Sequence, residues 1–135
     1  MRVLCLVIIL ISSALFANEV KHVRSADVSV LGIELMSSID DVKAILGAPD
    51  KIISSDYDVY DEVYSFKGLD IGFMDGKVDF IKITNPKWKL SNDLYVGKNF
   101  ESNGLSTFII NESDCSLNVI AKKLVIIELR IFCAI

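Results

Sequence analysis

Residues 37–49 read SSIDDVKAILGAP, and this stretch decides the fold that we expect. Ser37 or Ser38 can accept a hydrogen bond from the unpaired amides of a first helical turn. Gly47 can adopt the left-handed conformation that ends a helix, and Pro49 prevents the helix from continuing. The stretch therefore predicts a short helix with a defined start and a defined end.

One face of this helix is apolar, because Ile39, Val42, Ile45 and Leu46 recur three or four residues apart. A helix of this length is only marginally stable alone in water. We therefore expect it to pack on a sheet that the rest of the chain provides.

Most of the remaining chain alternates between apolar and polar residues, as antiparallel strands do. Residues 60–66 and 69–83 read as a three-stranded meander, with Asp75-Gly76 as a strong hairpin signal. Residues 107–110 predict a further strand, and residues 119–132 predict a second hairpin. The predicted fold class is α+β, an antiparallel β-sheet of about five to seven strands with one or two short helices packed on one face.

Two short stretches in the second half of the chain can be aligned with stretches in the first half. Residues 94–99 align with residues 33–38 at an offset of 61, and residues 124–129 align with residues 78–83 at an offset of 46. A degenerate tandem repeat is one interpretation, and the simple continuation of one sheet is the other.

The N-terminus has the pattern of a secretory signal peptide. Arg2 precedes a short apolar core, and small residues follow it, with cleavage expected after Ala14 or Ala17. We expect residues 1–17 to be the signal peptide, 18–27 a flexible N-terminal arm and 28–135 a single domain. The protein would then be periplasmic or secreted, without membrane insertion after cleavage; an uncleaved membrane anchor is the alternative.

Cleavage removes Cys5 and leaves two cysteines, Cys115 and Cys133. An even pair in an exported chain predicts a disulfide, which would be worth about 3 kcal/mol on the chain-entropy model. The alternative is a pair of buried thiols that never meet. Loss of Arg2 leaves 13 basic and 18 acidic residues, a net charge of −5, so we expect no nucleic-acid partner.

Several of these residues form a pattern that resembles the SmpA/OmlA domain of a small lipoprotein in outer-membrane protein assembly. The pattern is a capped helix of the form S-x-x-[DEQ]-V-x-x-x-L-G-x-P, an aromatic-rich strand and a D-G-K hairpin. The β-lactamase inhibitor protein is similar, as a tandem repeat of a related unit. The matching residues are Ser38, Asp41, Val42, Leu46, Gly47, Pro49, Tyr60, Tyr64, Phe66, Phe73, Asp75, Gly76, Lys77 and Val78.

The resemblance implies a helix-on-sheet fold and a role in binding other proteins. The chain departs from the family in two respects. No lipoprotein cysteine follows the apolar core of the signal, and Met36 stands where the family usually has glycine, although Gly97 keeps the glycine in the second half.

The sequence predicts no catalytic residues, no metal ligands and no cofactor. His22 is the only histidine and lies in the predicted arm, while Asp40 and Asp41 are explained by helix capping. The acidic run around residues 56–62 lacks the glycine turn and terminal Glu of a calcium-binding loop.

The same acidic run is instead the best candidate for binding a protein partner. Tyrosines offer large, stiff contact area, and interleaved carboxylates orient a basic partner. Trp88, between two lysines, is a second candidate anchor. The predicted protein-binding residues are Asp56, Tyr57, Asp58, Tyr60, Asp61, Glu62, Tyr64 and Trp88.

We therefore expect an exported, non-enzymatic protein-binding module. An inhibitor or immunity-type protein, which sterically occludes a secreted or periplasmic enzyme or toxin, is the first hypothesis. A structural accessory of a cell-envelope assembly is the alternative. An enzyme or a small-ligand carrier is the third hypothesis, and it would need a deep pocket with converging polar groups.

Overall fold

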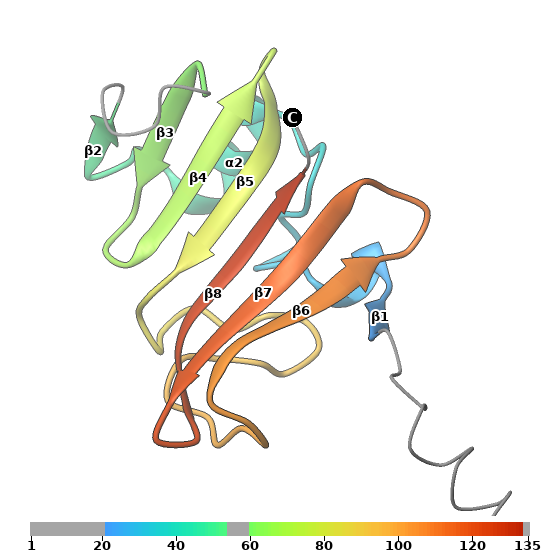
Figure 1. Cartoon of the computed structure of the whole chain (residues 1–135). Helices are drawn as coiled ribbons and strands as arrows, with labels where there is room; N and C mark the ends of the chain where they lie inside the picture. The colour runs from blue at the N-terminus through green and yellow to red at the C-terminus, as the bar shows by residue number, and fades with distance from the viewer. Residues whose placement is uncertain (1–20, 54–59, 134–135) are drawn as a thin grey trace, which may run out of the picture.

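The computed structural model describes residues 21–53 and 60–133, which form one twisted sheet with a helix behind it (Figure 1). The strand order in the sheet is β1-β6-β7-β8-β5-β4-β3-β2. Two helical segments precede most of the strands, η1 (Ser25–Asp27) and α2 (Ile39–Leu46). The strands are β1 (His22–Val23), β2 (Lys51–Ile53), β3 (Glu62–Ser65), β4 (Leu69–Met74), β5 (Lys77–Ile83), β6 (Gly104–Ile110), β7 (Cys115–Lys122) and β8 (Val125–Cys133).

The fold class that we expected from the sequence is wrong in two respects. The described residues form eight strands rather than five to seven, and the sheet is mixed rather than antiparallel. The mixed character comes from β1, which runs parallel to β6 with His22 opposite Ile109. The described part of the predicted N-terminal arm thus supplies a sheet strand and the short helix η1. A strand of two residues has too little pattern to be seen in the sequence.

The helix α2 begins and ends where its capping residues predict. The Ser38 side chain accepts a hydrogen bond from the Asp41 N–H at 3.1 Å, which satisfies one of the unpaired amides of the first turn. Gly47 follows the last helical residue with a φ of 76°. Val42 is fully buried, so the apolar side of α2 lies against the sheet.

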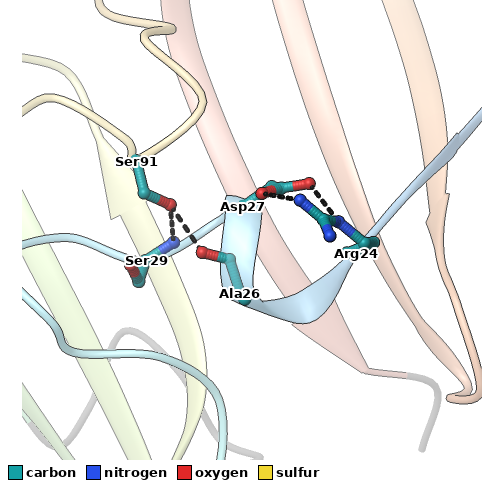
Figure 2. A network of polar contacts seen from close by, with 5 residues as sticks. All are labelled: Arg24, Ala26, Asp27, Ser29 and Ser91. Atoms are coloured by element: carbon teal, nitrogen blue, oxygen red, sulfur yellow. Dashed lines mark hydrogen bonds and ion pairs between the residues drawn. The ribbon is translucent and has the colours of Figure 1, made fainter.

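One face of the sheet carries the hydrophobic core. The segment before α2 and the connection between β5 and β6 pack on this face through Val28, Ile33, Trp88 and Leu90. A polar network joins these two covering segments (Figure 2). The Ser91 hydroxyl donates to the Ala26 carbonyl oxygen at 2.9 Å and accepts from the Ser29 N–H at 3.1 Å, and Arg24 pairs with Asp27 within the same segment. The network holds the N-terminal segment against the connection.

The two halves of the chain build the same structural unit. In the first half, the Met36 N–H donates to the Val78 carbonyl oxygen at 2.8 Å; in the second, the Gly97 N–H donates to the Ile126 oxygen at 2.8 Å. Met36 and Gly97 are 61 residues apart, whereas Val78 and Ile126 are 48 apart. The sequence alignment of residues 124–129 with residues 78–83, at an offset of 46, is therefore two residues out of register.

The irregularities of the two hairpins repeat as well. The register shifts between Gly72 and Phe73 in one hairpin and between Ile120 and Ala121 in the other, again 48 residues later. The second unit lacks a copy of α2 and β2, because only three residues separate Phe100 from the start of β6. The two units thus have corresponding hairpins, and the helix α2 belongs to the first unit alone.

The two units join edge to edge in the middle of the sheet, where β5 pairs antiparallel with β8. Lys82 lies directly opposite Arg130 in this pair, and the two residues are 48 positions apart. They are therefore equivalent positions of the two units that face each other. An approximate two-fold axis passes between them, as it does in an interface between identical subunits.

Candidate functional site

The second face of the sheet, which we call the open face, carries a row of polar side chains across its middle. Alternate residues of a strand point to opposite faces, so the neighbours of the core residues Ile81 and Ile131 belong to the open face. Successive cross-strand pairs connect the members of this polar row through five strands. The row consists of Asp70 on β4, Lys82 on β5, Arg130 on β8, Asn118 on β7 and Thr107 on β6.

The centre of the polar row contains two cations that share one carboxylate. Glu128 lies two residues before Arg130 on β8 and receives a hydrogen bond from the Arg130 Nε. Its other oxygen is 3.8 Å from the Lys82 Nζ. The Glu128 side chain is 15% exposed and the Lys82 side chain 25% exposed, so this contact is screened less by water than a typical surface pair.

Aromatic side chains lie beside the polar row. Phe80 and Phe132 are opposite each other in the β5–β8 pair, two residues from Lys82 and Arg130 respectively. The Tyr60 ring stacks on Phe80 with a centroid separation of 5.3 Å. The aromatic group therefore forms an apolar area next to the charged one.

Gly72 on β4 makes room for this stacking. A Cβ atom at Gly72 would lie 3.1 Å from the Tyr60 Cγ and 3.2 Å from the Phe80 Cβ. Real Cβ atoms rarely come so close, so a side chain here would push the Tyr60 ring outward. The glycine thus fixes how closely Tyr60 approaches the sheet.

These groups surround a shallow hollow of about 320 Å³ on the open face. It lies over the junction of the two units, at the approximate two-fold axis. The residues lining the hollow are Tyr60, Phe80, Lys82, Asn118, Arg130, Phe132 and Cys133. We take this hollow and the polar row that crosses it as the candidate functional site.

The predicted disulfide is present at one end of the hollow. Cys115 and Cys133 are opposite each other in the β7–β8 pair and are bonded, with a sequence separation of 18. Cys133 lines the hollow, so the bond connects the last strand to its neighbour beside the site.

The structure separates the residues predicted to bind a protein. Asp56, Tyr57 and Asp58 lie outside the described residues. Tyr60 lines the hollow, as described above. Glu62 is exposed, opposite Phe73 in the β3–β4 pair.

Asp61 has a structural role. One of its carboxylate oxygens accepts a hydrogen bond from the Asp75 N–H at 2.9 Å. This contact ties the residue to the turn between β4 and β5 and engages part of its side chain within the fold.

The interpretation of Tyr64 and Trp88 as exposed contacts is wrong. Tyr64 is only 4% exposed and packs edge-on against Phe73 with a centroid separation of 4.9 Å. Trp88 is 8% exposed, and its indole Nε1 donates to the Lys67 carbonyl oxygen at 3.2 Å. Both rings stabilise the core face and are unavailable to a partner.

Sequence reasoning missed five residues of the hollow: Asn118 on β7, the pair Phe80 and Lys82 on β5, and the pair Arg130 and Phe132 on β8. The alternation of β5 and β8 does place each pair on one face of its own strand. What the sequence does not show is that these two distant strands are neighbours, or in which register they pair.

The described residues contain no group of three or more His, Cys, Asp or Glu side chains that could hold a metal ion. His22 is exposed on β1. None of the helices in the described residues is long and apolar enough to cross a membrane.

No protein-family model and no curated protein matches the chain. The chain is similar in fold to the crystal structure of an extracellular protein containing an SCP domain from Bacillus anthracis str. Ames, with a TM-score of 0.53 and 13% sequence identity. The match covers 86% of this chain and 49% of the other, so the chain spans about half the length of that protein. At this identity the likeness concerns the fold alone.

Proposed function

We propose that the protein is an exported, non-enzymatic module that binds another protein through the open face of its sheet. The observation that carries this proposal is the hollow at the junction of the two units, where stacked aromatic rings adjoin an arginine. Aromatic and arginine side chains dominate the binding energy of protein interfaces.

The shape of the site favours a protein partner over a small molecule. The hollow of about 320 Å³ is at the lower limit of small-molecule pockets. The polar row continues beyond it on both sides over five strands. A partner that uses the whole row must present an extended surface, as a folded protein does.

The setting of the site also supports this proposal. The open face belongs to a continuous sheet with a core beneath it and a disulfide at one end, so little needs to be ordered on binding. The disulfide is consistent with an exported protein, as is the signal-like N-terminus. We propose the periplasm or the exterior of the cell as its location.

The first form of this function is that of an inhibitor or immunity-type protein, which occludes a secreted enzyme or toxin. The alternative form is an accessory that stabilises a cell-envelope assembly. The two forms differ in what binding does to the partner: the first abolishes an activity, whereas the second does not.

The test is an affinity capture from native envelope and secreted fractions with the mature, oxidised protein. The Lys82→Gln/Arg130→Gln variant should lose the partner. The matched control is Lys122→Gln/Lys123→Gln, which removes the same charge from the exposed tip of the β7–β8 hairpin. The captured protein is then purified, and its binding and activity are measured again.

A stoichiometric partner that is retained by the control and lost by the site variant supports the proposal. Loss of the partner's enzymatic or toxic activity in the complex identifies the inhibitor form, and unchanged activity identifies the accessory form. Absence of any stoichiometric protein partner, or equal capture by both variants, would overturn it.

A further inference from the structure

The middle of the polar row presents hydrogen-bond donors without matching acceptors. Arg130 donates to Glu128 from Nε, and among the described residues its two terminal Nη atoms have no acceptor. The Asn118 side-chain oxygen accepts from the Thr107 hydroxyl at 3.0 Å, and its amide nitrogen has no acceptor in the described part of the chain. Both residues line the hollow, as does Lys82. A ligand that displaces water from these donors gains most when it supplies acceptor oxygens in its place.

The two charged side chains that line the hollow are both cations. Lys82 and Arg130 are directly opposite each other, and like charges in this position destabilise a sheet. Glu128 offsets one positive charge of the two, and Asp70 is on the far side of Lys82 from Arg130. The lining of the hollow itself includes both cations and neither carboxylate.

The two-fold relationship between the units narrows the kind of anion. Lys82 and Arg130 occupy equivalent positions on either side of the axis, so an anion between them meets one cation on each side. A carboxylate has two equivalent oxygens and the same two-fold symmetry, and arginine binds it with good geometry.

The aromatic group defines what must accompany the carboxylate. Phe80 and Phe132 are two residues from the cations on the same strands, about 7 Å away along the strand. Phe80 is only 6% exposed beneath the Tyr60 ring, so an apolar or aromatic side chain next to the carboxylate would reach Phe132 and Tyr60. Its burial would add to the binding energy.

We propose that the hollow binds a segment of the partner protein in which an acidic side chain adjoins an aromatic one. The carboxylate is held between Lys82 and Arg130, with the Asn118 amide donating to it, and the aromatic ring packs on Phe132 and Tyr60. This inference rests on the proposed function, since it names the chemistry that the open face recognises in its partner.

The test uses two peptides with the full mature protein. The acidic probe is acetyl-Gly-Ala-Phe-Glu-Ala-Gly-amide, and the matched neutral probe replaces Glu with Gln. Binding is followed by NMR titration, with the side-chain signals of Asn118 and the arginines as reporters. We expect the acidic peptide to bind about tenfold more tightly, because a charge-assisted hydrogen bond is replaced by a neutral one.

Variants of the protein test whether the preference for the acidic peptide arises at the hollow. Arg130→Gln should bring the ratio of the two affinities close to one, whereas the control Lys122→Gln should leave it unchanged. A second control replaces Phe with Ala in the acidic peptide, which should weaken binding by a similar factor. Equal binding of the Glu and Gln peptides, no binding of either, or an unchanged ratio in Arg130→Gln would overturn the proposal.

The peptide experiment and the affinity capture can disprove the ligand chemistry and the proposed function separately. If the peptides do not bind but Lys82→Gln/Arg130→Gln still loses a protein partner, the ligand chemistry is wrong and the protein-binding function stands. If the acidic peptide binds selectively but no protein partner is captured, the site recognises the chemistry and the protein-binding function falls.

Discussion

Met36 and Gly97 occupy equivalent positions of the two units, and both have a positive φ, of 73° and 100° respectively. This conformation is strained for methionine and easy for glycine. The first unit therefore carries a backbone strain that the second unit avoids, at a methionine whose exposed fraction is 64%.

The first prediction follows from this pair. Met36→Gly should stabilise the protein by about 0.5–1 kcal/mol, since relief of the strain exceeds the added entropy of the unfolded chain. The reverse change, Gly97→Met, should destabilise it by at least as much. Urea unfolding measures both free energies. Met36→Ala serves as the control, because it removes the same side chain and keeps the strain. A gain in Met36→Ala equal to that in Met36→Gly would contradict the explanation.

A second prediction concerns the disulfide. The variant Cys115→Ser/Cys133→Ser should lose about 3 kcal/mol of unfolding free energy, because its unfolded chain is no longer closed into a loop. The unreduced and reduced forms of the wild-type protein are compared with it in the same urea titration. The reduced wild-type protein should match the variant. If all three have the same unfolding midpoint, the bond does not stabilise the fold.

The position of Tyr60 over Gly72 gives a third prediction. Gly72→Ala should displace the Tyr60 ring and cost about 1 kcal/mol, because the added methyl group overpacks the contact. Near-ultraviolet circular dichroism reports the displaced ring, and urea unfolding reports the stability. Ser116→Ala is the control on the same face, where Ser116 lies opposite Phe132. An unchanged tyrosine signal in Gly72→Ala would show that the ring does not depend on the glycine.

The burial of Trp88 leads to a fourth prediction, which separates stability from binding. Trp88→Phe removes the hydrogen bond to the Lys67 carbonyl and should cost about 1 kcal/mol or slightly more. Capture of a partner should be unaffected at temperatures where the variant is folded. Weaker capture by a fully folded Trp88→Phe variant would restore the residue as a binding contact.

The carboxyl of Asp79 on β5 provides a prediction about pH. Burial raises the pKa of Asp79, so the folded protein binds this proton more tightly than the unfolded chain does. The wild-type protein should therefore lose stability relative to Asp79→Asn as the pH rises from about 3 to about 6. Urea unfolding of both proteins across this range measures the difference.

Glu101 is the counterpart with the opposite sign. A hydrogen bond from Lys21 lowers the pKa of Glu101, so its contribution to stability is present above the ordinary pKa and is lost as the pH falls. Glu101→Gln should therefore be less stable to unfolding than the wild-type protein at neutral pH, and this difference should disappear as the pH falls. For each variant, the difference in unfolding free energy from wild type is plotted against pH. The same sign of slope for Asp79→Asn and Glu101→Gln would contradict the pKa directions given for both residues.

The parts of the fold that local chemistry determines could be predicted from the sequence. Ser38 and Gly47 define α2 by capping, and Asp75-Gly76 defines the β4–β5 turn, because each requirement is met by a few adjacent residues. The disulfide followed from counting cysteines. The strand number and the mixed sheet could not be predicted, because β1 pairs with a strand far along the chain.

The candidate site was predicted only at Tyr60. Nothing in the sequence distinguishes Tyr64 and Trp88 from Tyr60, but Tyr64 points to the core from β3 and Trp88 packs on the core from the connection between β5 and β6. The charged and aromatic pairs of the hollow depend on the register between β5 and β8, which are joined by a connection of more than 40 residues. No local pattern specifies such a register.

The pairing of β1 with β6 has a consequence for the time course of synthesis. The ribosome completes His22 long before Ile109, its partner 87 residues later, because synthesis of the residues between them takes about 4–17 s at the usual rates of elongation. The middle of the sheet has the same delay, because β5 has no neighbour on one side until β8 has been made. The nascent chain therefore holds an unpaired, apolar strand edge until its last segment emerges, and folding can be completed only after translation of β8.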